Sequence, residues 1–167
     1  MLVAVVVSIC YATSMKQLIL HDIRSAYNVG AMFRTADGAG VEKIYLSGYT
    51  ATPIDRFGRI QAEIKKTSLG ASETVAWEKV ESLQTLIKKL QSDGATVVAV
   101  EQADKSISIK EFAEPENVVY VMGNEVDGVP DVALELADVI VELPMLGEKE
   151  SLNVSVAAGI VLYHALV

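Results

Sequence analysis

The sequence has a single cysteine, two histidines and few aromatic residues. Because Cys10 is alone, an internal disulfide and a cysteine-based zinc site are both excluded, and a reducing compartment such as the cytoplasm is favoured. The only histidines are His21 and His164, and no GxSxG nucleophile elbow accompanies them. We therefore expect both histidines to be structural, which argues against a serine hydrolase, and we expect no bound metal.

The glycine patterns of two large nucleotide-binding classes are also missing. No GxGxxG follows the first apolar segment, so a Rossmann dinucleotide site is not supported. Residues 123–130 (GNEVDGVP) have two glycines five positions apart, but Val-Pro stands where a P-loop needs Lys followed by Ser or Thr. Neither class of nucleotide site explains this chain.

The sequence also lacks an apolar run long enough to span a bilayer. The apolar segment at residues 2–12 is too short, and no Lys or Arg precedes it, which makes it a poor signal peptide. Met15 then opens a segment that looks like the start of a domain. We expect residues 1–14 to be an apolar extension outside the fold, residues 15–167 to form one domain, and no membrane association.

Positive charge is scarce but unevenly distributed. The net charge is −8, which taken alone argues against a nucleic-acid partner. Residues 1–70 nevertheless contain eight Lys and Arg against five acidic residues, whereas residues 71–167 contain six against seventeen. A basic face on an acidic body can bind phosphate groups with strong salt dependence, although an uneven solvated surface is the simpler interpretation of charge alone.

Apolar segments alternate with amphipathic ones along most of the chain. Asn28 is predicted to cap the first helix, and Ser151 to begin the last one. Strands that alternate with helices predict an α/β fold built on a parallel sheet. Strands are predicted at residues 16–21, 41–48, 74–77, 95–101, 117–123 and 138–144, and helices at residues 29–39, 59–66, 78–94, 131–137 and 152–166.

Three polar segments follow predicted strands, at the positions where ligands bind in open α/β sheets. In residues 28–40 (NVGAMFRTADGAG), Gly30 and Arg34 are one helical turn apart, so a phosphate or ribose could approach the guanidinium over the glycine. Residues 121–129 (VMGNEVDGV) end a strand with a glycine, an amide and a carboxylate, and residues 143–159 (LPMLGEKESLNVSVAAG) lead a polar loop into an apolar helix. Each segment alone also fits an ordinary capped helix or turn.

Together, in this order and spacing, the three segments resemble the signature motifs of the SpoU (TrmH-like) family of RNA ribose 2′-O-methyltransferases. The resemblance runs from about Met15 to the last residue. It implies the SPOUT fold, which is a parallel-sheet α/β fold with a C-terminal trefoil knot. It also implies S-adenosylmethionine as the cofactor and a homodimer whose active site is completed at the subunit interface.

The resemblance further implies roles for individual residues. Because a guanidinium holds its proton tightly, we expect Arg34 to clamp a phosphate and stabilise developing oxyanion charge, with Glu125 orienting Arg34 or the ribose. The residues that match the active-site positions of the family are Asn28, Arg34, Glu125, Ser151 and Asn153. Those expected to contact the cofactor are Val100, Glu101, Gly123, Leu143, Met145, Ser151 and Leu152.

The expected RNA partner would be bound by basic side chains from the first half of the chain. These are Arg24, Arg34, Arg56, Arg59, Lys65 and Lys66. A bare catalytic domain is expected, with tRNA as the first choice of substrate and rRNA as the second. Three other interpretations stay open: a homologue that binds cofactor or RNA without turnover, a base methylase of the same class, and a non-enzymatic dimeric scaffold.

Overall fold

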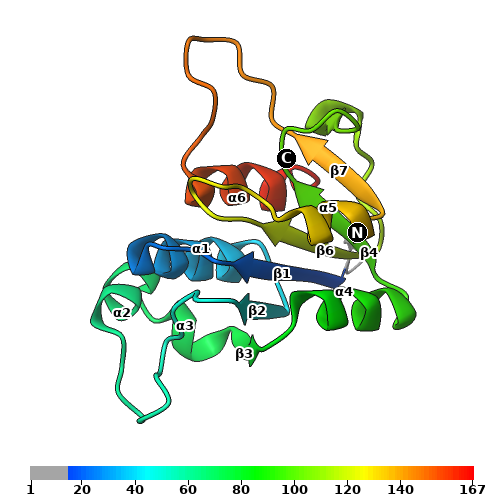
Figure 1. Ribbon diagram of the computed structural model, residues 1–167. Helices are drawn as coiled ribbons and strands as arrows, with labels where there is room; N and C mark the ends of the chain where they lie inside the picture. The colour runs from blue at the N-terminus through cyan, green and yellow to red at the C-terminus, as the bar shows by residue number, and fades with distance from the viewer. Residues whose placement is uncertain (1–14) are drawn as a thin grey trace, which may run out of the picture.

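A seven-stranded sheet forms the centre of the computed structural model, which describes residues 15–167 (Figure 1). Its strands are β1 (Met15–His21), β2 (Lys43–Ser47), β3 (Ala76–Val80), β4 (Thr96–Val100), β5 (Ile107–Ser108), β6 (Asn117–Met122) and β7 (Val139–Glu142). Their order in the sheet is β3-β2-β1-β6-β4-β7-β5, and every pairing between them is parallel. The predicted parallel α/β fold is confirmed. The trefoil knot stays a prediction, and the prediction for residues 1–14 lies outside the described residues.

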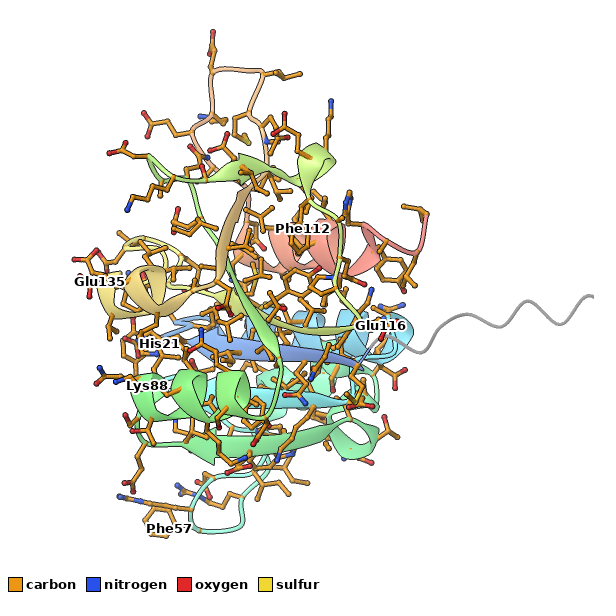
Figure 2. The ribbon with its side chains drawn as sticks, turned by 90° about the vertical axis from the view of Figure 1, so that its right-hand side faces the viewer. His21, Phe57, Lys88, Phe112, Glu116 and Glu135 are labelled. Carbon is orange, nitrogen blue, oxygen red and sulfur yellow. The ribbon has the colours of Figure 1, made fainter. Side chains whose placement is uncertain are left out.

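Helices cover both faces of the sheet. They are α1 (Ala26–Gly38), α2 (Ala62–Ser68), α3 (Ala71–Thr74), α4 (Leu83–Ser92), α5 (Asp131–Leu136) and α6 (Val154–Tyr163), with a 3₁₀ helix at Ile109–Glu111. One core includes residues of α1 and α6, and the other includes residues of α4 and α5 (Figure 2). Leu18 and Leu20 of β1 belong to the first core and Ile19 to the second, as the alternation of a strand requires. Within residues 15–167, no helix has the length and apolar character needed to cross a membrane.

Helix α1 begins three residues earlier than predicted. The Ser25 side chain accepts a hydrogen bond of 3.3 Å from the backbone N–H of Asn28, so Ser25 is the N-cap. The prediction that Asn28 caps this helix is therefore wrong. Since Asn28 lies inside the first turn, its amide is free to bond to other parts of the molecule.

Helix α6 also has a different cap from the predicted one. It begins at Val154, and the Asn153 side-chain oxygen accepts a hydrogen bond of 2.9 Å from the backbone N–H of Ser155. Ser151, which was expected to begin this helix, lies in the preceding loop, and its hydroxyl makes no hydrogen bond within the described residues. An exposed hydroxyl without a partner is available to a ligand.

The segment from residue 74 to residue 94 divides differently from the prediction. Strand β3 continues to Val80, with Glu78 paired across the sheet to Lys43 of β2 at 2.6 Å. Helix α4 then starts at Leu83 because the Ser82 side chain caps it. The first turn of the predicted helix is therefore strand.

Gly30 lies where α1 packs against α2, and it does not leave a bare face. A Cβ atom at Gly30 would overlap the Thr67 hydroxyl and would lie 2.7 Å from the Ile64 carbonyl oxygen. The interpretation that this glycine makes room for a phosphate or ribose is therefore wrong. Its missing side chain lets the two helices approach closely.

A buried ion pair lies at the amino end of the sheet. Lys16 Nζ is 2.8 Å from the Glu114 carboxylate, and the two side chains are only 2% and 4% exposed. Lys16 also donates to the carbonyl oxygen of Leu162 at 3.2 Å, and the Tyr120 hydroxyl donates to Glu114 at 2.6 Å. Burial and this hydrogen bond to Glu114 raise the pKa of the Tyr120 phenol. The cluster joins β1 and β6 to the end of α6.

Candidate active site

A cavity of about 420 Å³ lies beyond the carboxyl ends of β4, β6 and β7. Its volume falls in the range of ordinary small-molecule sites. Leu143, Met145 and Leu152 provide apolar surface from the segment between β7 and α6. The cavity is lined by all seven residues that were predicted to contact a cofactor: Val100, Glu101, Gly123, Leu143, Met145, Ser151 and Leu152.

The loop between β6 and α5 forms a tight turn at this cavity. Asn124 and Gly128 exchange two backbone hydrogen bonds, of 2.9 and 3.0 Å. A side chain at Gly123 would overlap the backbone of Gly128, and Gly128 itself has a φ of +72°, a conformation that favours glycine. The two glycines therefore allow the turn to close on itself.

Glu101 connects the end of β4 to the same turn. Its carboxylate accepts hydrogen bonds from the backbone N–H groups of Val129 at 2.8 Å and Gln102 at 2.9 Å. A Cβ atom at Gly128 would overlap this carboxylate. Glu101 therefore holds one wall of the cavity in place through the backbone of the turn.

The three motif segments meet in a chain of polar side chains beside the cavity. The Glu125 carboxylate accepts hydrogen bonds from the backbone N–H groups of Arg24 at 2.9 Å and Ser25 at 3.1 Å, and from the Asn28 amide at 2.9 Å. The Asn153 amide in turn donates to the Asn28 side-chain oxygen at 3.3 Å. Residues that are 97 and 125 positions apart in the sequence are thereby brought together.

The charge of Glu125 is stabilised by neutral donors. Burial raises its pKa, but the hydrogen bonds from Arg24, Asn28 and Ser25 outweigh burial and lower the pKa below its ordinary value. A carboxylate at this position also complements the positive amino end of α1. Glu125 therefore orients Asn28. It was expected to orient Arg34 or the ribose, and within one chain it does not contact Arg34.

Arg34 lies apart from this polar chain. It is exposed on α1 and belongs to a different groove, of about 680 Å³, together with Lys66 of α2 and Tyr163 of α6. Glu125 and Ser151 line the cavity, and Asn28 and Asn153 are hydrogen-bonded beside it. The fold thus brings together four of the five predicted active-site residues, and Arg34 is the exception.

The six predicted RNA-binding side chains are all exposed. They fall at separate places: Arg24 beside the cavity, Arg34 with Lys66 in the second groove, Arg56 with Arg59 in the loop after β2, and Lys65 on α2. Two of them have acidic partners, since Arg59 is 2.7 Å from Asp55 and Lys65 is 3.8 Å from Glu73. Exposed ion pairs of this kind contribute little and can open for a phosphate.

Asn124 was not among the predicted site residues, although it lies within the second motif. Its side chain is buried and donates to the Asp22 carbonyl oxygen at 2.9 Å and to the Tyr49 hydroxyl. It joins the turn of the cavity to the end of β1 and to the loop after β2. The sequence did contain a signal for Asn124, because it is an amide next to Gly123 at the end of an apolar segment. Nothing local in the sequence pointed to Tyr49.

His21 takes part in a Ser/His/Asp arrangement that is not suited to hydrolysis. Its ring contacts the Ser47 hydroxyl at 2.8 Å and the Asp22 carboxylate at 3.2 Å. Ser47 is fully buried, so a substrate cannot reach it as a nucleophile. Burial lowers the pKa of His21, with Asp22 acting against that change and Lys79 adding to it. In residues 15–167, no group of three or more His, Cys, Asp or Glu side chains is placed to hold a metal ion.

Comparison with known families agrees with the placement of the three motifs. The model of the SpoU rRNA Methylase family matches residues 15–163. The chain belongs to this family. The match extends over nearly all the described residues and therefore includes the cavity, the turn between β6 and α5, and both helices that carry motif residues.

Similar curated proteins in bacteria are named 23S rRNA (guanosine-2′-O-)-methyltransferase RlmB. The protein from Neisseria meningitidis serogroup B is 35% identical over 145 residues, which are 87% of this chain and 55% of the relative. The protein from Pseudomonas aeruginosa is also 35% identical, over 150 residues, which are 89% of this chain and 57% of the relative. The chain thus spans about half the length of the curated relatives it matches.

Solved structures with similar folds include proteins described as acting on rRNA and on tRNA. The AdoMet-bound rRNA methyltransferase from Sinorhizobium meliloti has a TM-score of 0.82 and 28% identity, covering 92% of this chain and 56% of that one. The A. aeolicus TrmH/SpoU tRNA modifying enzyme has a TM-score of 0.79 and 29% identity, covering 91% and 74%. A structure described by the 2-OH methylation of C/U34 on tRNA has a TM-score of 0.76 and 26% identity, covering 92% and 95%.

Proposed function

We propose that this chain transfers a methyl group from S-adenosylmethionine to a ribose 2′-hydroxyl of RNA. The observation that carries the proposal is the cavity, because its lining includes every position at which the motifs predict cofactor contact. Membership of the SpoU family supports the same chemistry, as do the names of the curated relatives and the AdoMet bound to the Sinorhizobium meliloti protein.

The residues of the cavity suit this cofactor. Leu143, Met145 and Leu152 would pack against its adenine ring. Within residues 15–167, no backbone N–H group between residues 145 and 152 donates a hydrogen bond, so these groups are available to the polar edge of the ring. The bound cofactor supplies an electrophilic sulfonium methyl group. The protein then has to hold the ribose 2′-hydroxyl in line with that methyl group.

The polar chain beside the cavity would position that ribose. Glu125 holds Asn28, and Asn28 holds Asn153, each through a hydrogen bond, so neither amide needs to be ordered when substrate binds. The Ser151 hydroxyl is exposed at the cavity and free of hydrogen bonds within the described residues. It can therefore accept from or donate to the reacting hydroxyl.

Arg34 would be supplied by a second copy of the chain. Helix α6 exposes large apolar side chains, among them Val156 at 50% and Ile160 at 43%, and such a surface favours burial against a partner. Tyr163 of the same helix shares a groove with Arg34. A homodimer formed through α1 and α6 would bury this surface and bring Arg34 toward the other cavity, where it would stabilise developing negative charge.

Ribosomal RNA is the substrate class that we favour, with tRNA second. The curated relatives are named for 23S rRNA, whereas two solved relatives are described by tRNA modification. The preference for tRNA that the sequence suggested is thus not confirmed. A cytoplasmic location belongs to the same proposal, since the curated relatives are bacterial enzymes of rRNA.

The first test is methyl transfer from labelled S-adenosylmethionine to rRNA and to tRNA, each taken from cells that lack this protein. Methylation of a ribose 2′-hydroxyl makes the adjacent linkage resistant to nucleases, so the label should appear in a resistant dinucleotide. Label in a free base would support a base methylase instead. Cofactor binding without any transfer to either RNA would overturn the proposal and favour a homologue without turnover.

A second test asks where Arg34 acts. Arg34→Ala should lower turnover by roughly a hundredfold or more, while cofactor affinity should stay unchanged because the proposed partner of Arg34 is the reacting RNA and not the cofactor. Lys88→Gln, which removes an exposed charge from α4, is the control. Mixing Arg34→Ala with the cavity variant Gly123→Val should restore part of the activity if the residue acts across the dimer. No restoration in verified mixed dimers would place Arg34 in its own subunit's site or outside catalysis.

A further inference from the structure

The loop after β2 contains a small hairpin whose shape is set by Asp55. Ile54 and Ile60 pair as an antiparallel bridge, and the Asp55 backbone N–H donates to the Arg59 carbonyl oxygen at 2.9 Å. The Asp55 carboxylate accepts hydrogen bonds from the backbone N–H groups of Phe57 at 2.8 Å and Arg59 at 2.9 Å. The backbone of the hairpin is therefore ordered by its own hydrogen bonds before any ligand arrives.

Phe57 lies at the far end of this hairpin and is 67% exposed (Figure 2). The Arg56 guanidinium carbon is 4.8 Å from the centroid of the Phe57 ring, and that of Arg59 is 5.1 Å from it. The exposed ring offers a flat apolar surface that a ligand can cover. Two guanidinium groups on the ring keep positive charge beside the aromatic surface.

The hairpin and the candidate active site are both on the side of the sheet where the strands have their carboxyl ends, with the hairpin toward β3 and the cavity toward β7 (Figure 1). It follows β2, which only β1 separates from β6 in the sheet. Tyr49, at the base of this loop, accepts a hydrogen bond from Asn124 in the turn of the cavity. An RNA strand that reaches the cavity would pass the carboxyl ends of β1 and β2 to meet the hairpin.

We propose that Arg56, Phe57 and Arg59 form a stacking site for an unpaired base of the RNA, a few nucleotides from the target ribose. The inference rests on the proposed function. Aromatic rings and guanidinium planes both stack on bases, and the positive charge favours the neighbouring phosphate. Arg56 has no ion-pair partner among the described residues, which leaves its charge available to that phosphate.

An apolar protein segment is the other occupant that this surface could attract. The groove beside the hairpin, of about 870 Å³, includes Trp77 as well as Phe57. It also contains the cations Arg56, Arg59 and Lys79, with Asp55 as the acidic residue of its lining, and this excess of positive charge favours a polyanion. RNA is therefore the better match.

The test measures binding of a short unstructured oligoribonucleotide that contains 2-aminopurine, whose fluorescence falls when the base is stacked. Phe57→Ala should weaken binding by roughly tenfold and reduce the quenching. Phe57→Trp should retain both, because it keeps a ring. Phe57→Leu keeps apolar volume without a ring and should behave like Phe57→Ala. Lys88→Gln on α4 should change neither quantity.

Two results would overturn this inference. One is wild-type affinity and quenching in Phe57→Ala, and the other is full affinity in Phe57→Leu, which would point to an apolar partner. Binding is measured without turnover, so a failure of methyl transfer by the wild-type protein would contradict the proposed function alone. Arg56→Lys, which keeps the charge but loses the guanidinium plane, should bind more tightly than Arg56→Gln and more weakly than the wild type.

Discussion

The two ends of the sheet hold a glutamate in different ways. At the amino end, Glu114 is buried against the charge of Lys16, and all its contacts are internal. At the carboxyl end, Glu125 is only partly buried and is held by backbone and amide N–H groups, next to a cavity. The first arrangement connects strands and a helix inside the protein, whereas the second orients side chains beside a cavity that a ligand can fill.

Because of this difference, substitutions at the amino end should mainly affect stability, and substitutions at the carboxyl end should mainly affect the site. Removing a partner from the buried pair leaves a charge without compensation, which costs free energy wherever the protein is folded. When a polar group near the cavity is changed, water can replace the lost hydrogen bonds. The free energy of unfolding then falls less, but the remaining side chains of the site are no longer held in position. Substitutions at the two ends should therefore give different ratios of lost stability to lost cofactor affinity.

The largest effect is expected from Glu114→Gln. It leaves the Lys16 ammonium buried and unpaired, so the free energy of unfolding should fall by about 3 kcal/mol, as measured by urea denaturation. Cofactor affinity of the folded protein should stay the same. Glu111→Gln, a nearby exposed change, should have almost no effect on stability. An equal and small effect of both changes would show that the pair contributes nothing.

Gly128→Ala should have the next largest effect, and it acts on the site. The new Cβ atom would overlap the Glu101 carboxylate at a position with a φ of +72°. We expect a loss of about 1 to 2 kcal/mol of stability from the backbone conformation alone. Cofactor affinity, measured by titration calorimetry, should fall by roughly tenfold or more because the turn has to shift.

Gly94→Ala is the matched control for this prediction. Gly94 has a φ of +89° at the end of α4, but a Cβ atom there would meet nothing within 4 Å. It should therefore cause a similar loss of stability without a change in cofactor affinity. If both variants bound the cofactor like the wild type, the turn between β6 and α5 would not be part of the cofactor site.

The cavity at the carboxyl end of the sheet could largely be predicted from the sequence, whereas the ion pair at the amino end could not. Apolar runs located six of the seven strands, and motifs placed just after strands located the cavity, because the carboxyl ends of parallel strands meet at one edge. The pair of Lys16 and Glu114 had no such signal. Its two members are 98 positions apart and neither stands in a pattern that local propensity can read.

The errors within the site have local physical causes. Ser25 and Asn28 are both good N-caps, and only the hydrogen bond from Asn28 N–H to the Ser25 hydroxyl decides between them. Gly30 looked like open space because a missing side chain in the sequence does not reveal a neighbouring helix. The role of Arg34 stays a prediction, because its position relative to a cavity depends on how α1 packs and on a partner subunit, and the motif contains neither.

The smallest effect, and the sharpest test of the comparison, concerns the pH dependence of Glu125→Gln. The pKa of Glu125 is lowered in the folded protein, so its ionised form stabilises the fold. That contribution is present above the ordinary glutamate pKa of about 4.3 and is lost as the pH falls through the lowered folded pKa. At neutral pH, the free energy of unfolding of the wild type should exceed that of the variant by only about 1 kcal/mol, because solvent weakens the interaction.

The difference in the free energy of unfolding between wild type and Glu125→Gln should therefore shrink as the pH is lowered below the ordinary glutamate pKa. Urea denaturation at several pH values measures it directly. A double-mutant cycle with Asn28→Ala should give a coupling energy near 1 kcal/mol at neutral pH and less in acid, because the amide donates to the charged carboxylate. A difference that stays constant with pH would mean that the Glu125 charge is not what holds Asn28.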